Sequence, residues 1–142
     1  MLAGQVVDVI NDGKKVDADT LRFIHTKKTG AMIEGAFLAG AALGGANDAT
    51  KEILQQAATK IGLAFQIQDD ILDVIGTVEE LGKPLHSDEK NAKNTYVSLF
   101  GLEASEAEVE RLTAQALEQL ESFGSRSAFL QELTKHLVGR RK

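Results

Sequence analysis

Residues 65–73 read Phe-Gln-Ile-Gln-Asp-Asp-Ile-Leu-Asp. The polar side chains Gln66, Asp69, Asp70 and Asp73 are three or four positions apart, so in a helix they share one face. The apolar residues between them fall on the other faces, as in an amphipathic helix. The spacing therefore predicts a helix here, with three carboxylates gathered on its polar face.

Three carboxylates so close together repel one another, and they are costly to bury without a cation. Hard oxygen ligands at this density suit Mg²⁺, which keeps several waters and typically also binds substrate phosphates. A calcium-binding EF-hand loop is excluded, because that motif needs acids at alternate positions and a glycine at the sixth. The alternative is a solvated acidic face, which the neighbouring Ile67, Ile71 and Leu72 make less favourable.

The rest of the chain also predicts helices, and the expected fold class is all-α. The chain of 142 residues contains one proline, and no long segment alternates with the period of a strand. The expected elements are the end of a helix over 1–11, a helix capped by Asp17 or Asp19 with an irregularity at Gly30, a helix over 49–75 ended by Gly76, a loop over 76–94, a short helix over 95–100, a helix capped by Ser105 with Glu108, and a last helix capped by Ser125 or Ser127.

Composition narrows the class of protein. The chain carries 16 basic and 21 acidic residues, a net charge of −5, which is unfavourable for binding nucleic acid or an anionic membrane. It has no cysteine, so thiol nucleophiles and zinc–thiolate sites are excluded. No apolar stretch approaches the ~18 residues of a membrane span. We therefore expect a cytoplasmic protein with no nucleic-acid or membrane partner.

Two further segments carry candidate phosphate-binding residues. Residues 27–30 read Lys-Lys-Thr-Gly at the expected helix irregularity, where a lysine can bind a phosphate as a point charge. The predicted loop 76–94 follows the acidic helix and carries Lys83 and Lys93, which suits a lid over a polyphosphate. The alternatives are an exposed lysine pair and a polar surface loop.

Taken together, the motifs resemble those of the trans-isoprenyl diphosphate synthase (polyprenyl synthetase) family. The similarity is closest to bacterial short-chain enzymes of the farnesyl diphosphate synthase, or geranyltranstransferase, type. The motifs are, in order, Gly4-Gln5 with Asp8, His25, Lys28-Thr29-Gly30, residues 62–66, residues 69–73, Gly82-Lys83-Pro84, Asp88, residues 93–96 and Arg140-Arg141-Lys142.

The resemblance implies a prenyltransferase that condenses an allylic diphosphate with isopentenyl diphosphate, as in farnesyl or geranylgeranyl diphosphate synthesis. It implies that Mg²⁺ is held by Asp69, Asp70 and Asp73, with Asp88 in contact with the metal-bound water. It also implies the following substrate contacts: Lys28, Lys83 and Lys93 at the allylic diphosphate, Thr29 and Gln66 at the reacting centre, and Arg140 with its basic neighbours over isopentenyl diphosphate.

The family pattern also has a first aspartate-rich motif followed by an arginine pair, and this sequence does not contain them. We therefore expect residues 1–142 to form the C-terminal half of one isoprenoid synthase helical bundle, inactive alone in chain elongation. Uncovered apolar helix faces predict a homo-oligomer, most simply a dimer. Two alternatives remain open: a non-catalytic or regulatory subunit that binds prenyl diphosphates, and a Mg²⁺-dependent hydrolase or terpene cyclase-like enzyme.

Overall fold

The computed structural model describes the backbone of residues 1–81 and 94–140, and the side chains of residues 1–76 and 94–140. Throughout these residues the chain is helical and contains no strand, which confirms the all-α prediction. The elements are α1 (Leu2–Ile10), α2 (Ala18–His25), the π-helix η1 (Thr26–Gly30), α3 (Ala31–Leu43), α4 (Asp48–Leu81), α5 (Tyr96–Phe100), α6 (Leu102–Glu121), the 3₁₀ turn η2 (Gly124–Ser127) and α7 (Ala128–Val138).

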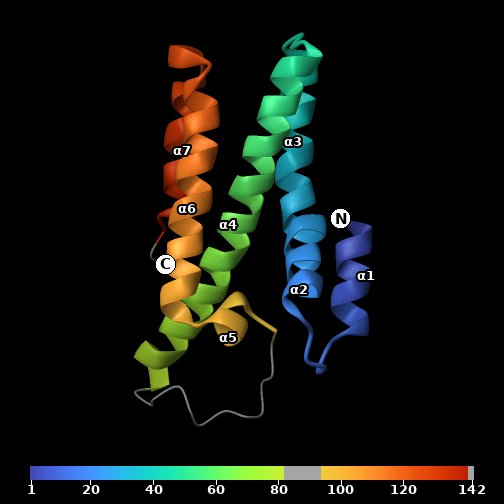
Figure 1. Ribbon diagram of the computed structural model, residues 1–142, viewed down its shortest axis with the longest axis vertical. Helices are drawn as coiled ribbons and strands as arrows, with labels where there is room; N and C mark the ends of the chain where they lie inside the picture. The colour runs from blue at the N-terminus through green and yellow to red at the C-terminus, as the bar shows by residue number, and fades with distance from the viewer. Residues whose placement is uncertain (82–93, 141–142) are drawn as a thin grey trace.

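Helix α4 is the centre of the structure. It packs against α6 on one side and against α3 and η1 on the other, while α7 lies alongside α6 and α1 alongside α2 (Figure 1). Its residues Leu63, Ala64, Ile67 and Ile71 are buried in one core cluster, and Ala57 and Ile61 contribute to a second. The acidic sequence motif therefore lies on the helix that contributes the most buried apolar residues in the described part of the chain. Within the described residues, no helix combines the length and the apolarity that a membrane crossing requires.

Two of the predicted helix boundaries are wrong. Helix α4 continues through Gly76 to Leu81, because a glycine lowers helix stability without stopping a long helix that is packed on both sides. Helix α6 begins at Leu102, since Gly101 turns the chain at φ +84°. Ser105 therefore lies inside α6 and is not a cap: its hydroxyl donates to the Gly101 carbonyl over 2.7 Å.

The predicted cap at Asp17 is confirmed, whereas the predicted cap at Ser127 is not made by its side chain. The Asp17 carboxylate caps α2 by accepting from the Thr20 backbone N–H over 2.7 Å. Thr95 caps α5 in a reciprocal capping box with Ser98. Ser127 occupies the N-cap position of α7, but its hydroxyl donates to the Leu120 carbonyl over 2.6 Å instead of accepting from the helix.

The irregularity predicted at Gly30 is the π-helix η1, which joins α2 to α3 and carries Lys28 and Thr29. Neighbouring backbones hold this turn on two sides. A Cβ added to Gly62 of α4 would lie 2.7 Å from the Gly30 Cα. A Cβ added to Gly4 of α1 would lie 2.5 Å from the Lys28 backbone nitrogen. Both glycines therefore allow backbone contacts that no larger residue permits.

This packing gives a first prediction. Gly62→Ala should destabilise the fold by about 1–3 kcal/mol, since the new methyl group meets backbone atoms that cannot rotate away. Gly76→Ala is the matched control: it lies in the same helix with open space around it, and it should stabilise by up to about 1 kcal/mol through helix propensity. Urea unfolding of the two variants measures both effects. Equal effects would contradict the close α4–η1 contact.

Candidate functional site

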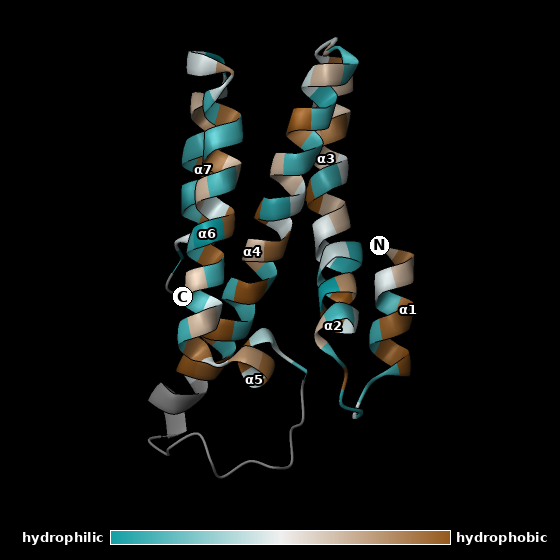
Figure 2. Ribbon diagram, in the orientation of Figure 1, coloured by the Kyte–Doolittle hydropathy of each residue, from teal (hydrophilic) through white to brown (hydrophobic). Residues whose placement is uncertain are grey.

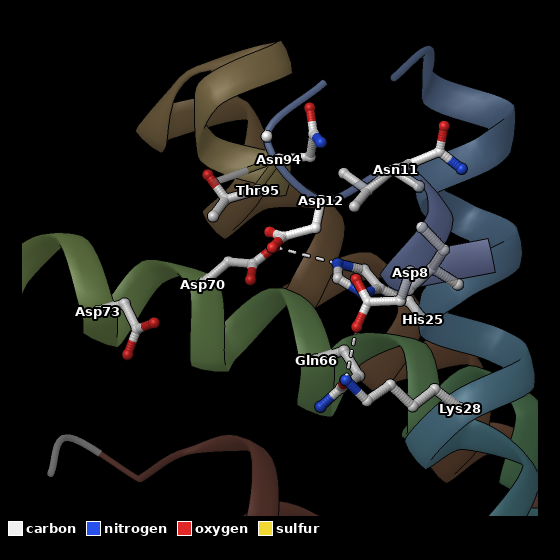
Figure 3. A pocket seen from close by; sticks show the side chains of 13 residues that line it. Asp8, Asn11, Asp12, His25, Lys28, Gln66, Asp70, Asp73, Asn94 and Thr95 are labelled. Atoms are coloured by element: carbon white, nitrogen blue, oxygen red, sulfur yellow. Dashed lines mark hydrogen bonds and ion pairs between the residues drawn. The ribbon is translucent and has the colours of Figure 1, made fainter. Parts of the chain in front are cut away.

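A cavity of about 280 Å³ opens where the end of α1, the end of α2, η1, α4 and the start of α5 meet (Figure 3). We call it the Lys28–Asp70 cavity. Its polar lining includes both basic and acidic side chains from segments far apart in the sequence. The lining residues are Asp8, Asn11, Asp12, Gly13, Leu21, Ile24, His25, Lys28, Gln66, Asp70, Asp73, Asn94 and Thr95.

Asp70 is the most firmly held of the three aspartates. Its Oδ2 lies 3.0 Å from Nε2 of His25 on α2 and accepts from the Tyr96 backbone N–H of α5 over 2.7 Å. The side chains of Asp70 and His25 are only 14% and 9% exposed. Asp70 therefore joins three helices at the edge of the cavity, and one of its carboxylate oxygens is committed to that junction.

Lys28 projects from η1 into the same cavity. Its ammonium donates to Oδ2 of Asp8 on α1 over 2.7 Å, as the dashed line in Figure 3 marks. Both side chains remain partly exposed, so the ammonium is within reach of a ligand in the cavity. Thr29 is half-buried on the same turn but is not among the lining residues. The structure therefore brings together four of the predicted site residues, Lys28, Gln66, Asp70 and Asp73, around one cavity.

Asp69 faces a different neighbour. Its Oδ1 forms an ion pair with the Arg140 guanidinium, and its Oδ2 accepts from the Gln66 amide over 3.2 Å. The guanidinium also lies over the Phe65 ring, 3.9 Å from its centroid. Asp69 and Asp73 are one helical turn apart on α4. Gln66 lines the cavity and also donates to Asp69, so it links the cavity to the ion pair of Asp69 with Arg140.

Electrostatics at Asp69 favour an additional cation. Partial burial raises the pKa of Asp69 above its ordinary value, and this effect exceeds the opposing attraction of Arg140. The charges of Asp73 and Asp70 raise it further. The carboxylate is therefore incompletely compensated, even with a guanidinium against it.

The carboxylate oxygens of α4 fit Mg²⁺ in type. Within residues 1–76 and 94–140, no group of three His, Asp or Glu side chains is arranged to hold a metal ion. Mg²⁺ commonly takes one or two carboxylates and completes its shell with water and substrate phosphate oxygens, so the carboxylates of α4 suit it in type and number.

The structure describes one of the remaining predicted site residues and leaves the others outside the described part of the chain. Lys83, Asp88 and Lys93 lie outside the described residues. Arg140 is described, and it lies against Asp69 and Phe65, with its backbone carbonyl accepting from the Gln68 amide over 3.2 Å.

The cavity also contains residues to which the sequence assigned no chemistry. Asp12 lines the cavity from the turn that follows α1. Asn94 holds that turn to the start of α5: its amide oxygen accepts from the Val16 N–H over 3.0 Å and its amide nitrogen donates to the Lys14 carbonyl over 2.5 Å. These residues act through contacts 78 and 80 positions apart, which no local pattern reveals.

Known proteins resemble this chain in both sequence and fold. The polyprenyl synthetase family model matches residues 1–132. A geranylgeranyl diphosphate synthase of Cyanophora paradoxa is 40% identical over 99% of this chain and 47% of its own length. A dimethylallyltranstransferase of Fischerella ambigua is 41% identical over 99% of this chain and 41% of its own length. The chain thus spans less than half the length of these relatives.

Solved structures give the same result. A putative farnesyl-diphosphate synthase from Marinomonas sp. MED121 aligns with a TM-score of 0.82 at 33% identity, over 97% of this chain and 46% of that one. A Helicobacter pylori geranyltransferase complexed with magnesium and isoprenyl diphosphate aligns with a TM-score of 0.74 at 33% identity, over 98% of this chain and 46% of that one. These matches confirm the resemblance drawn from the motifs: the chain belongs to the polyprenyl synthetase family, whose named relatives are enzymes.

Proposed function

We propose that this chain binds an allylic diphosphate through Mg²⁺ and so provides one side of a site for condensation with isopentenyl diphosphate. The observation that carries the proposal is the pairing of opposite charges around one cavity: the Lys28 ammonium from η1 and the carboxylates of α4. A diphosphate needs a cation on its oxygens, and the carboxylates need a cation between themselves and the ligand.

Each side chain has a defined task in this proposal. Mg²⁺ bound at Asp69 and Asp73 would neutralise the leaving diphosphate and so favour ionisation of the allylic carbon–oxygen bond. Lys28 binds the diphosphate directly as a point charge. Gln66, which lines the cavity, and Thr29, on the same turn as Lys28, are assigned to the carbon that becomes cationic, where their oxygen dipoles would stabilise the charge. No covalent intermediate with the protein is required.

The remaining predicted contacts extend the same site. We propose that Lys83 and Lys93 add positive charge at the allylic diphosphate and that Asp88 orients metal-bound water. Arg140 is proposed to meet isopentenyl diphosphate. Its guanidinium already lies beside Asp69 and over Phe65, next to the proposed metal position.

The chain is proposed to form one half of a two-sided site and to be inactive alone in chain elongation. Its sequence contains one aspartate-rich motif, whereas the family pattern has a second, opposing one. A regulatory subunit that binds prenyl diphosphates is the second candidate, and one relative bears the name of a heterodimeric geranylgeranyl pyrophosphate synthase large subunit.

Uncovered apolar helix faces support a dimer. Figure 2 shows apolar colouring on the outer helices α1 and α3. Their exposed large apolar side chains are Leu2, Val6, Val9, Ile10, Met32 and Leu43. Met32 is 60% exposed. An apolar area of this kind commonly marks an interaction surface.

Calorimetry with geranyl diphosphate tests the proposed function. We expect saturable binding of one ligand per chain in the presence of Mg²⁺, and binding at least about tenfold weaker when EDTA replaces the metal. Farnesol, which lacks the diphosphate, is the control for non-specific binding to apolar surface. Equal binding with and without Mg²⁺ would overturn the metal-dependent function.

A further inference from the structure

Helix α1 carries a motif that the proposed function leaves without a role. Gly4 and Asp8 are one helical turn apart and therefore lie on one face of α1. Gly4 is the buried residue of a helix whose other side chains are partly or fully exposed. Both members of the pair contact the same short segment, the π-helix η1 that carries Lys28.

The contact of Gly4 fixes how closely α1 approaches η1. A Cβ on Gly4 would lie 2.5 Å from the Lys27 carbonyl carbon and 2.5 Å from the Lys28 backbone nitrogen. The two backbones therefore touch at Lys28 itself. One turn further along α1, the Asp8 carboxylate accepts from the Lys28 ammonium over 2.7 Å. The same face of α1 thus holds both ends of the lysine, its backbone and its charged group.

We propose that Gly4 and Asp8 position the Lys28 ammonium for a diphosphate group, with Asp8 as a positioning residue that does not itself touch the ligand's carbon skeleton. The inference rests on the proposed function, in which Lys28 binds the diphosphate. A lysine side chain is flexible, and a point charge at its end gains affinity when it is held where the ligand needs it.

The partial exposure of the Lys28–Asp8 ion pair indicates that the pair orients the ammonium and does not stabilise the fold. The Lys28 and Asp8 side chains are 37% and 41% exposed. Ion pairs exposed to this degree contribute little to folding, because water screens them. In the folded protein, however, the pair directs the ammonium toward the cavity that also holds Gln66, Asp70 and Asp73.

A purely electrostatic role for Asp8 would have the opposite effect on binding. If Asp8 only added negative charge near the ligand, its removal would strengthen the binding of an anion. Asp12 provides the matched control, since its carboxylate lines the same cavity but is not the partner of Lys28. The variants Asp8→Asn and Asp12→Asn therefore make the same change in charge at the same site.

The experiment measures binding of inorganic diphosphate with Mg²⁺ by calorimetry. We expect Asp8→Asn to weaken binding about fivefold, and Asp12→Asn to leave it unchanged or tighten it. Asp8→Glu should restore most of the affinity, because it keeps the carboxylate. In a Lys28→Gln background, Asp8→Asn should have no further effect. The unfolding midpoint in urea should not change with Asp8→Asn, which separates positioning from a loss of structure.

Three outcomes would overturn the inference. In the first, Asp8→Asn tightens binding as Asp12→Asn does. In the second, the effect of Asp8→Asn persists when Lys28 is replaced by glutamine. Either result leaves the proposed function intact if Lys28→Gln alone weakens binding. In the third, Lys28→Gln alone leaves the affinity unchanged; the diphosphate role of Lys28 is then wrong, and the positioning role falls with it.

Discussion

Replacing Asp70 with alanine should destabilise the fold by about 3 kcal/mol, the largest loss of stability that we expect from any single carboxylate of this chain. The side chain is 14% exposed and accepts from both His25 and the Tyr96 backbone N–H. Removing it leaves two donors on the buried residues His25 and Tyr96 without their acceptor, and a buried unpaired donor costs about 1–3 kcal/mol.

Urea unfolding of Asp70→Ala against Glu132→Ala measures the effect. Glu132 is the control because its ion pair with Lys135 is of normal length, 2.8 Å, but exposed to water. We expect Glu132→Ala to cost at most about 1 kcal/mol. His25→Ala should be strongly destabilising as well, and the double variant should cost less than the sum of the two, since the residues act as a pair. If Asp70→Ala costs no more than Glu132→Ala, the proposed junction does not contribute to stability.

This junction shows what sequence spacing can and cannot predict. The steps of three and four positions correctly place Gln66, Asp69, Asp70 and Asp73 on one side of a helix. Spacing does not reveal what packs against each side chain. Asp70 meets His25 and Tyr96, 45 and 26 positions away, whereas Asp69 meets Arg140, 71 positions away. Asp69 and Asp70, adjacent in the sequence, therefore have different partners.

The helices themselves were largely predictable, because apolar periodicity and capping are local properties. The cap at Asp17 and the irregularity at Gly30 are such cases. The C-terminal end of α4 and the start of α6 were not, since α4 continues past Gly76 and a glycine with positive φ precedes α6. The contact of Gly4 with η1 is likewise a tertiary property. Only the three-dimensional structure shows why a larger residue does not fit at this position.

The second large effect concerns metal-dependent binding. We expect Asp73→Ala to weaken the binding of Mg²⁺ with inorganic diphosphate about a hundredfold. Loss of a residue that merely orients a metal ligand typically costs 10–100-fold, and loss of a ligand should cost at least as much. Asp48→Ala is the control: it removes a fully exposed carboxylate at the other end of the same helix. Calorimetric titration of both variants gives the ratio.

Asp69→Ala provides a test that separates charge from coordination. The substitution removes a proposed metal ligand, and it also releases Arg140 from its ion pair. A released guanidinium can bind diphosphate directly, so affinity measured in EDTA should rise, whereas the additional affinity that Mg²⁺ provides should fall. Asp69→Asn keeps the shape of the side chain and should behave in the same way. If the gain from Mg²⁺ survives in both variants, Asp69 does not hold the metal, and the site must be built on Asp73 and other donors.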